Sequence, residues 1–177
     1  MPKLTVSLAL LALAATTFAQ QRPSPPGTAE TTLKGKKITI NYSRPRINDP
    51  RTGQPRKIMG GLVPYGDVWR TGANEATTFV TEAPVTVGGK DVPAGSYTLF
   101  TLPEQDKWTL IISRKTGEWG IPYPGQQDDF ARIPMKVETL TSTVDPFTIS
   151  FDKKSDTEAA LKLAWEKTQA SVDVKAK

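Results

Sequence analysis

The sequence predicts an all-β protein: one antiparallel β-sandwich of about nine short strands in a single domain. Three observations support this prediction. Apolar and polar residues alternate in several segments, such as Lys36–Tyr42, and this alternation is typical of a strand with one buried face. Turn residues interrupt the chain about every eight to twelve residues. Finally, 177 residues suffice for one domain, which must rely on its hydrophobic core because cysteine, and therefore any disulfide bond, is absent.

The first 19 residues have the pattern of a signal peptide. A positive charge at Lys3 precedes an apolar run of about a dozen residues, which is shorter than the ~20 residues of a membrane-spanning helix. Small residues stand at the −3 and −1 positions before a cleavage site after Ala19. We therefore expect a secreted or periplasmic protein without a transmembrane span. Residues 20–30 are predicted to form a proline-rich tether, and residues 31–177 the β-sandwich domain.

Strands are expected where β-branched or aromatic residues lie between turn signals. After a short strand around Leu33, these segments are Lys36–Tyr42, Thr77–Thr81, Pro84–Val87, Lys90–Val92, Ser96–Leu102, Lys107–Ser113, Ile133–Leu140, Phe147–Phe151, Ala159–Glu166 and Ser171–Lys175. Gly88 and Gly89 predict a tight hairpin, because glycine readily adopts the positive φ of a type I′ turn.

One segment, residues 158–166, is ambiguous. It contains good helix formers, and Asp156 is a potential helix N-cap. However, Leu161, Leu163 and Trp165 alternate with more polar or smaller residues, which favours a strand. We predict a strand and retain the helix as the alternative.

Two long irregular segments are expected to be loops. The first, Arg44–Gly66, is rich in proline and glycine, and the second spans Arg114–Phe130. Loops of this length in a compact domain are usually functional or disordered. The first loop also concentrates basic residues in a chain whose net charge is +5, namely Arg44, Arg46, Arg51, Arg56 and Lys57. Such a cluster suits an anionic cell-envelope surface, but it is also typical of an ordinary solvated face.

The composition excludes several kinds of chemistry. Without histidine or cysteine, Ser-His-Asp and Cys-His catalysis are excluded, and zinc, copper or haem sites are not expected. Asp128 and Asp129 form a weak candidate calcium site, although an adjacent acidic pair is more often simply solvated. No motif indicates a cofactor, and no nucleic-acid motif is present, so we expect neither partner.

The segment V-W-R-T-G-A-N-E-A-T, residues 68–77, combines unusual side chains. Trp69 supplies an aromatic face, Arg70 a guanidinium fork, Asn74 an amide and Glu75 a carboxylate. This set suits a polar, ring-shaped ligand such as a sugar. An anchored corner would use the same residue types, with Arg70 paired to Glu75 and Trp69 closing one end of the sandwich.

Four further residues are candidates for ligand contact. Tyr65 and Trp119 are loop aromatics that either contact a ligand or cover the core. Arg44 and Arg46 flank a proline on an extended segment, so their side chains are expected on the same side, where they would clamp an anion or face solvent. We expect residues 69–75 to form the floor of the main cleft and the Arg44–Gly66 loop to form one wall.

Several motifs resemble a known family. The block W-R-T-G-A-N-E-A-T is followed, in order, by V-P-A-G-S-Y-T-L-F-T-L-P, W-T-L-I-I-S, G-E-W-G and L-A-W-E-K-T. Together they resemble a secreted bacterial domain-of-unknown-function family, DUF2911, over about residues 38–177. The resemblance implies a secreted all-β domain and no particular activity.

These observations favour a non-catalytic binding module for a saccharide or an anionic envelope ligand. One alternative is a hydrolase that uses Glu75 as acid or base, although the sequence brings no second carboxylate near it and contains no G-x-S-x-G, P-loop or dinucleotide motif. The other is a purely structural or protein-interaction domain. The sequence does not predict the oligomeric state.

Overall fold

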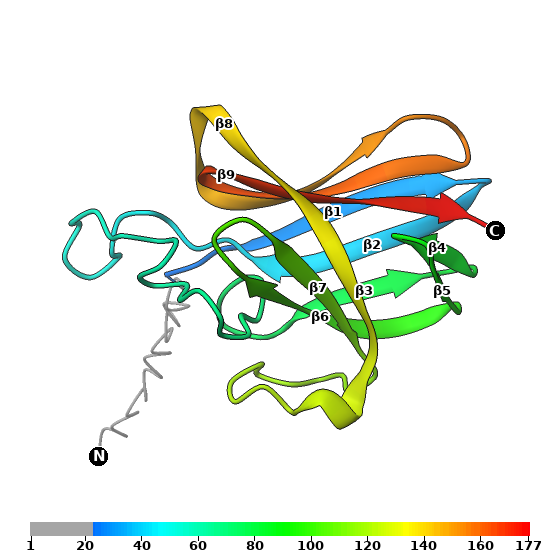
Figure 1. The fold of residues 1–177 in the computed structure, drawn as a ribbon, viewed down its shortest axis with the longest axis horizontal. Coiled ribbons are helices and arrows are strands. Elements are labelled where there is room, and N and C mark those ends of the chain that lie inside the picture. Colours follow the sequence, from blue (N-terminus) through cyan, green and yellow to red (C-terminus); the bar gives the residue numbers. More distant parts are fainter. Residues whose placement is uncertain (1–22) are drawn as a thin grey trace, which may run out of the picture.

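The fold, described for residues 23–177 by a computed structural model, is all-β, as the sequence predicts. The predicted signal peptide and the first residues of the tether lie outside the described residues. Nine strands and one 3-10 turn, η1, appear in chain order (Figure 1): β1 Pro26–Leu33, β2 Lys36–Ser43, β3 Thr77–Thr81, β4 Val85–Val87, β5 Lys90–Val92, β6 Gly95–Pro103, β7 Trp108–Ser113, η1 Gln126–Asp128, β8 Asp129–Lys153 and β9 Glu158–Ala176. Within residues 23–177 there is no helix long and apolar enough to cross a membrane.

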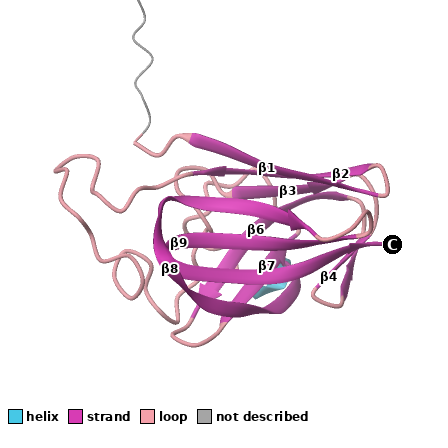
Figure 2. Ribbon diagram, turned by 90° about the horizontal axis from the view of Figure 1, so that it is seen from above, coloured by secondary structure: helices cyan, strands magenta, loops and turns pink. Residues whose placement is uncertain are grey.

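All nine strands belong to one antiparallel sheet, in the order β1-β2-β3-β6-β7-β8-β9-β4-β5. The sheet folds over itself because β8 is long enough to take part in two layers. Its first part, Asp129–Met135, pairs with β7, and the rest, from Lys136, pairs with β9. Figures 1 and 2 show β8 crossing from one layer to the other, and β1 contacts both β8 and β9.

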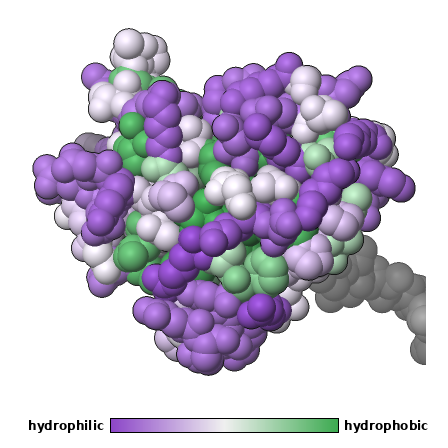
Figure 3. All heavy atoms as spheres, turned by 45° about the vertical axis from the view of Figure 1, so that its right-hand side comes forward, coloured by the Kyte–Doolittle hydropathy of each residue, from purple (hydrophilic) through white to green (hydrophobic). Residues whose placement is uncertain are grey.

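The core lies between these layers and contains large apolar side chains from both. On β9, Leu161, Leu163 and Trp165 are each only 1% exposed, so the ambiguous segment is a strand and its period-two pattern marks the buried face. The predicted hairpin is also confirmed, with Gly88 at φ 52° and Gly89 at φ 83°. On the face shown in Figure 3, hydrophilic side chains predominate and apolar ones appear only in small areas between them.

Two expectations about strand limits were wrong. The last four predicted strands form only two long strands, β8 and β9. The pairing of β8 with β9 continues through the irregular residues, with register shifts around Val144 and a left-handed conformation at Glu166. The first strand begins at Pro26, inside the segment assigned to the tether. A proline is tolerated there because β1 is at the edge of the sheet and Pro26 is its first residue.

A tyrosine hydroxyl joins the two layers directly. Tyr42 of β2 donates its hydroxyl hydrogen to the carbonyl of Ile149 of β8, at 3.3 Å, and accepts a hydrogen bond from the Ile149 amide, at 2.9 Å. Its ring also packs edge-on against Phe147, with 5.8 Å between the ring centroids. The side chain is buried, so both Ile149 groups depend on this hydroxyl.

We expect Tyr42→Phe to lower the free energy of unfolding by about 1 to 3 kcal/mol, because it leaves the buried Ile149 amide and carbonyl without their partner. Urea denaturation measures this loss. Tyr65→Phe is the matched control, since Tyr65 is 44% exposed and its hydroxyl has no hydrogen bond within residues 23–177. Equal stabilities of the two variants would contradict the role given to the Tyr42 hydroxyl.

Candidate binding site

The segment Trp69–Glu75 forms a corner that is attached to the first layer by backbone hydrogen bonds. The Trp69 amide donates to the Thr101 carbonyl of β6, at 2.7 Å, and the Thr101 amide donates back, at 2.9 Å. The indole Nε1 of Trp69 donates to the Gly72 carbonyl at 3.1 Å. Backbone and side chain of Trp69 are therefore both fixed.

The ring of Trp69 lies within an aromatic cluster at the end of the sandwich. It stacks on Trp165 of β9 with 5.9 Å between ring centroids and an interplanar angle of 20°. It also contacts Phe147 and Trp108, at centroid distances of 4.9 and 6.3 Å. Trp69 thus closes the sandwich end, as the structural alternative expected, and only part of its surface remains accessible.

The corner contains two left-handed residues that are not glycine. Thr71 and Asn74 both have φ of 56°. Thr71 is fully buried, and a β-branched residue in this conformation is strained by about 1 to 3 kcal/mol. Its hydroxyl approaches that of Thr101 at 3.2 Å, and its carbonyl accepts a hydrogen bond from Thr77. Gly72 is needed for close approach, because a Cβ there would lie 3.1 Å from the Ser43 carbonyl oxygen.

Arg70 connects the corner to the second loop. Its Nη1 donates to the carbonyls of Asn74, at 2.6 Å, and Trp119, at 3.2 Å, and its guanidinium lies 5.9 Å from the centroid of the Trp119 ring. Burial lowers the pKa of Arg70 from its ordinary value, but an arginine remains charged at neutral pH. These contacts fix the guanidinium against neutral acceptors.

The pairing of Arg70 with Glu75, which the structural alternative expected, is not found among the ion pairs within residues 23–177. The Arg70 guanidinium donates to the Asn74 and Trp119 carbonyls instead, and Glu75 is exposed. Glu75 lines a different depression of about 320 Å³, together with Asn41 and other residues of the first layer. The expected convergence of Trp69, Arg70, Asn74 and Glu75 in one cleft is therefore not observed.

A cavity of about 300 Å³ lies between the corner and the first loop. The corner supplies Trp69, Arg70, Gly72 and Ala73. The other lining residues come mainly from the first loop: Pro23, Ser24, Pro45, Arg46, Pro50, Arg56, Leu62, Val63, Ile121 and Trp165. Three of the lining residues are arginines and none is acidic, so the cavity is electrically positive.

Trp165, one of the residues that line the cavity, has a buried polar group without a partner. Trp165 is 1% exposed, and its Nε1–H has no hydrogen-bond acceptor in the structure described for residues 23–177. Most buried polar groups in proteins are hydrogen-bonded, so this donor calls for an explanation. From the sequence, Trp165 is identified only as a core residue, because alternation along a strand says nothing about the indole nitrogen.

The first loop is held in place over the sandwich. Arg44 donates to the Phe147 carbonyl, at 3.4 Å, and to Thr148 Oγ1, at 3.1 Å, while the Asp145 carboxylate accepts from the Ile47 amide. Arg44 therefore attaches the first loop to β8. The anion clamp of Arg44 and Arg46, which was one of the two alternatives from the sequence, is not formed. Arg46 is exposed and lines the cavity.

Arg56 fixes the loop from within. It donates to the carbonyls of Arg46, at 2.6 Å, and Ile47, at 3.3 Å, and lies 3.9 Å from the Asp49 carboxylate. Its position in the basic cluster is visible in the sequence. Its approach to Arg70 around one cavity depends on tertiary contacts that the sequence does not reveal.

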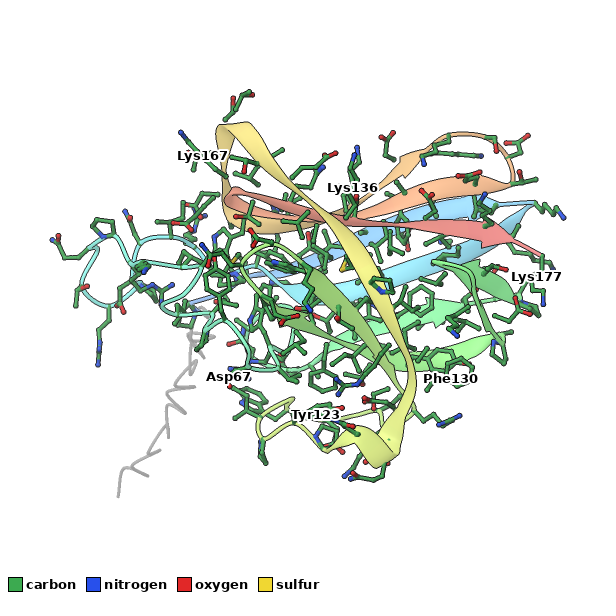
Figure 4. All side chains as sticks on the ribbon, viewed as in Figure 1. Asp67, Tyr123, Phe130, Lys136, Lys167 and Lys177 are labelled. Atoms are coloured by element: carbon green, nitrogen blue, oxygen red, sulfur yellow. The ribbon has the colours of Figure 1, made fainter. Side chains whose placement is uncertain are left out.

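The second loop borders a larger, open cavity of about 580 Å³, which also reaches Trp69 and Arg70. Asp67 and Tyr123 both line it, and Figure 4 shows them on the loops that border this side of the molecule. Tyr65 and Trp119 are 44% and 55% exposed, so neither covers the core.

The candidate metal residues have other roles. The Asp129 carboxylate accepts hydrogen bonds from Arg132, at 2.7 Å, and from the Tyr123 hydroxyl, so it anchors the second loop to β8. Burial and the bond to Asp129 raise the pKa of Tyr123. Asp128 contributes its carbonyl to the Arg114 amide. Within residues 23–177, no group of three or more potential ligand side chains could hold a metal ion.

The fold and the site define an antiparallel β domain with an arginine-lined cavity at one end of the sandwich. A family model described as "Protein of unknown function (DUF2911)" matches residues 24–174, which is most of the chain. The chain therefore belongs to the DUF2911 family, as the motifs suggested. No curated protein and no solved structure gives a significant match.

Asn74 provides a test of the corner. Its side chain donates to the Ser24 carbonyl, at 3.0 Å, and to Ser43 Oγ, at 3.2 Å. Asn74→Gly should cost about 1 to 2 kcal/mol for the lost hydrogen bonds, and Asn74→Ala about 1 kcal/mol more, because alanine is strained in the left-handed conformation. Chemical denaturation of both variants compares the costs. An alanine variant as stable as the glycine variant would contradict the positive φ.

Proposed function

We propose that this protein is a non-catalytic binding module whose arginine-lined cavity takes a small anionic ligand. The observation that supports this proposal best is the set of Arg46, Arg56 and Arg70 around one cavity without a lining carboxylate. A ligand with a carboxylate, phosphate or sulfate group would complement this charge, and guanidinium groups bind all three through paired hydrogen bonds.

The side chains of Arg56 and Arg70 are also pre-organised for ligand binding. Arg56 and Arg70 are already held by backbone carbonyls, so less conformational entropy is lost when a ligand binds. Arg70 uses only Nη1 in its hydrogen bonds within residues 23–177, which leaves Nε and Nη2 for a ligand. The cavity volume of about 300 Å³ is at the lower end of the range of small-molecule sites.

A neutral saccharide is supported less well than an anion. The expected stacking platform, Trp69, packs against Trp165 and Phe147, so little of its face is left for a sugar ring. The exposed Trp119 is the remaining platform, close to Arg70. An acidic sugar satisfies both features, and we include sugar acids among the proposed ligands.

Hydrolysis by Glu75 is the second candidate and is supported least. Glycoside hydrolysis needs two carboxylates about 5 to 9.5 Å apart. Glu75 is the only carboxylate among the described residues that line its depression.

The proposal also places the mature domain in the periplasm or outside the cell, on the basis of the signal-like residues 1–19.

Calorimetric titration with phosphate, sulfate and glucuronate tests the anion site. We expect wild type to bind at least one of them and Arg46→Ala to bind about 10- to 100-fold more weakly, because a charge-assisted hydrogen bond is lost. Affinity should also fall as salt is added.

Lys90→Ala is the matched control for this titration. It removes the same charge from the β4–β5 hairpin, far from the cavity, and should bind like wild type. The proposal is wrong if no anion binds to wild type, or if both variants lose the same affinity.

Mass spectrometry of the protein from its native host tests the predicted location. We expect a mature N-terminus at Gln20, after removal of residues 1–19. A cytosolic protein that retains Met1 would contradict the proposed secretion.

A further inference from the structure

The large hydrophobic side chains that are exposed within residues 23–177 all belong to the two loops around the arginine-lined cavity. They are Leu62 at 47%, Tyr65 at 44%, Trp119 at 55% and Ile121 at 63% exposure. Leu62 and Ile121 line the same cavities from opposite loops. Single exposed apolar residues are ordinary, but their restriction to one end of the molecule indicates an interaction surface.

The same end holds most of the surplus positive charge. Residues 44–72 contain six cations and only two acids, Asp49 and Asp67. Asp49 lies 3.9 Å from Arg56, and its carboxylate also accepts hydrogen bonds from the Arg51 and Thr52 amides. Arg46, Arg51 and Lys57 are exposed. Exposed cations therefore lie on the same loop as Leu62 and Tyr65, and Arg46 lines the cavity together with Leu62 and Ile121.

We propose that this end of the domain docks on the surface of a lipid bilayer that contains anionic lipids. The inference rests on the proposed anion site and specifies its ligand: the phosphate of a lipid headgroup occupies the arginine-lined cavity. Tyrosine and tryptophan favour the interface between headgroups and acyl chains, which suits Tyr65 and Trp119. Leu62 and Ile121 reach the apolar region, and the surrounding cations are attracted by the negative surface potential.

This combination fits a bilayer better than a soluble anion. A small soluble ligand needs only the cavity, and it leaves the exposed Tyr65, which does not line the cavity, without a role. A soluble polyanion needs the cations but gains nothing from exposed Leu62 and Ile121. A bilayer surface alone offers negative charge and an apolar layer at adjacent depths.

Co-sedimentation with lipid vesicles tests the inference. The full chain should bind vesicles of phosphatidylglycerol and phosphatidylcholine in equal parts, and bind vesicles of phosphatidylcholine alone much more weakly. Arg46→Ala should weaken binding to the anionic vesicles about fivefold, the effect of about 1 kcal/mol per cation near the surface. Lys90→Ala, at the other end of the sandwich, should bind like wild type.

A second variant separates this inference from the proposed anion site. Tyr65→Ser should weaken vesicle binding and keep wild-type affinity for inorganic phosphate, because Tyr65 lies outside the residues that line the cavity. Its urea denaturation profile checks that the fold is retained.

Three results would overturn the inference. Phosphate binding by wild type without vesicle binding leaves the anion site in place and removes the bilayer. Unchanged vesicle binding by Tyr65→Ser contradicts the contact between this loop and the bilayer. Binding of dextran sulfate, but not vesicles, by both wild type and Tyr65→Ser identifies a soluble polyanion as the partner.

Discussion

The stacking of Trp69 on Trp165 is the contact on which the rest of the structure at this end depends. Trp165 belongs to β9 in one layer, and Trp69 is bonded through its backbone to Thr101 of β6 in the other. Aromatic pairs contribute about 0.5 to 1.5 kcal/mol beyond the area they bury, and Phe147 adds a further contact to both rings. The rings close the sandwich and fix the start of the corner, so the positions of Arg70 and of the cavity follow from this contact.

The cluster has one cost, which is the indole N–H of Trp165. A buried donor without an acceptor destabilises a protein by about 1 to 3 kcal/mol, and Thr71 adds conformational strain in the same corner. Both features lie at the end of the sandwich, where Trp165 is also one of the residues that line the arginine-lined cavity.

The sequence predicts those parts of the fold that depend on local patterns. Alternation locates Leu161, Leu163 and Trp165 on a buried strand face, and the glycine pair locates the β4–β5 turn. The sequence did not predict that the last four strands join into two. Strand pairing can continue past irregular residues through register shifts, and no residue type marks the position of such a shift. The Arg70–Glu75 pair of the structural alternative is not observed because Arg70 donates to main-chain carbonyls, and residue types do not reveal which carbonyls lie within its reach. The cavity brings together segments distant in sequence, and only the tertiary fold places Arg46 and Arg56 next to Arg70.

The chemistry of the arginine contacts distinguishes a ligand site from a structural anchor. A buried arginine whose role is structural is usually matched by a carboxylate, since an unpaired charge away from water is costly. Arg70 instead donates to carbonyl oxygens, which orient its guanidinium group without neutralising it. Arg56 is also held mainly by carbonyls, with Asp49 at the longer distance of 3.9 Å. The guanidinium groups of Arg56 and Arg70 are therefore held in fixed orientations mainly by neutral acceptors, which is the arrangement that the proposed anion site requires.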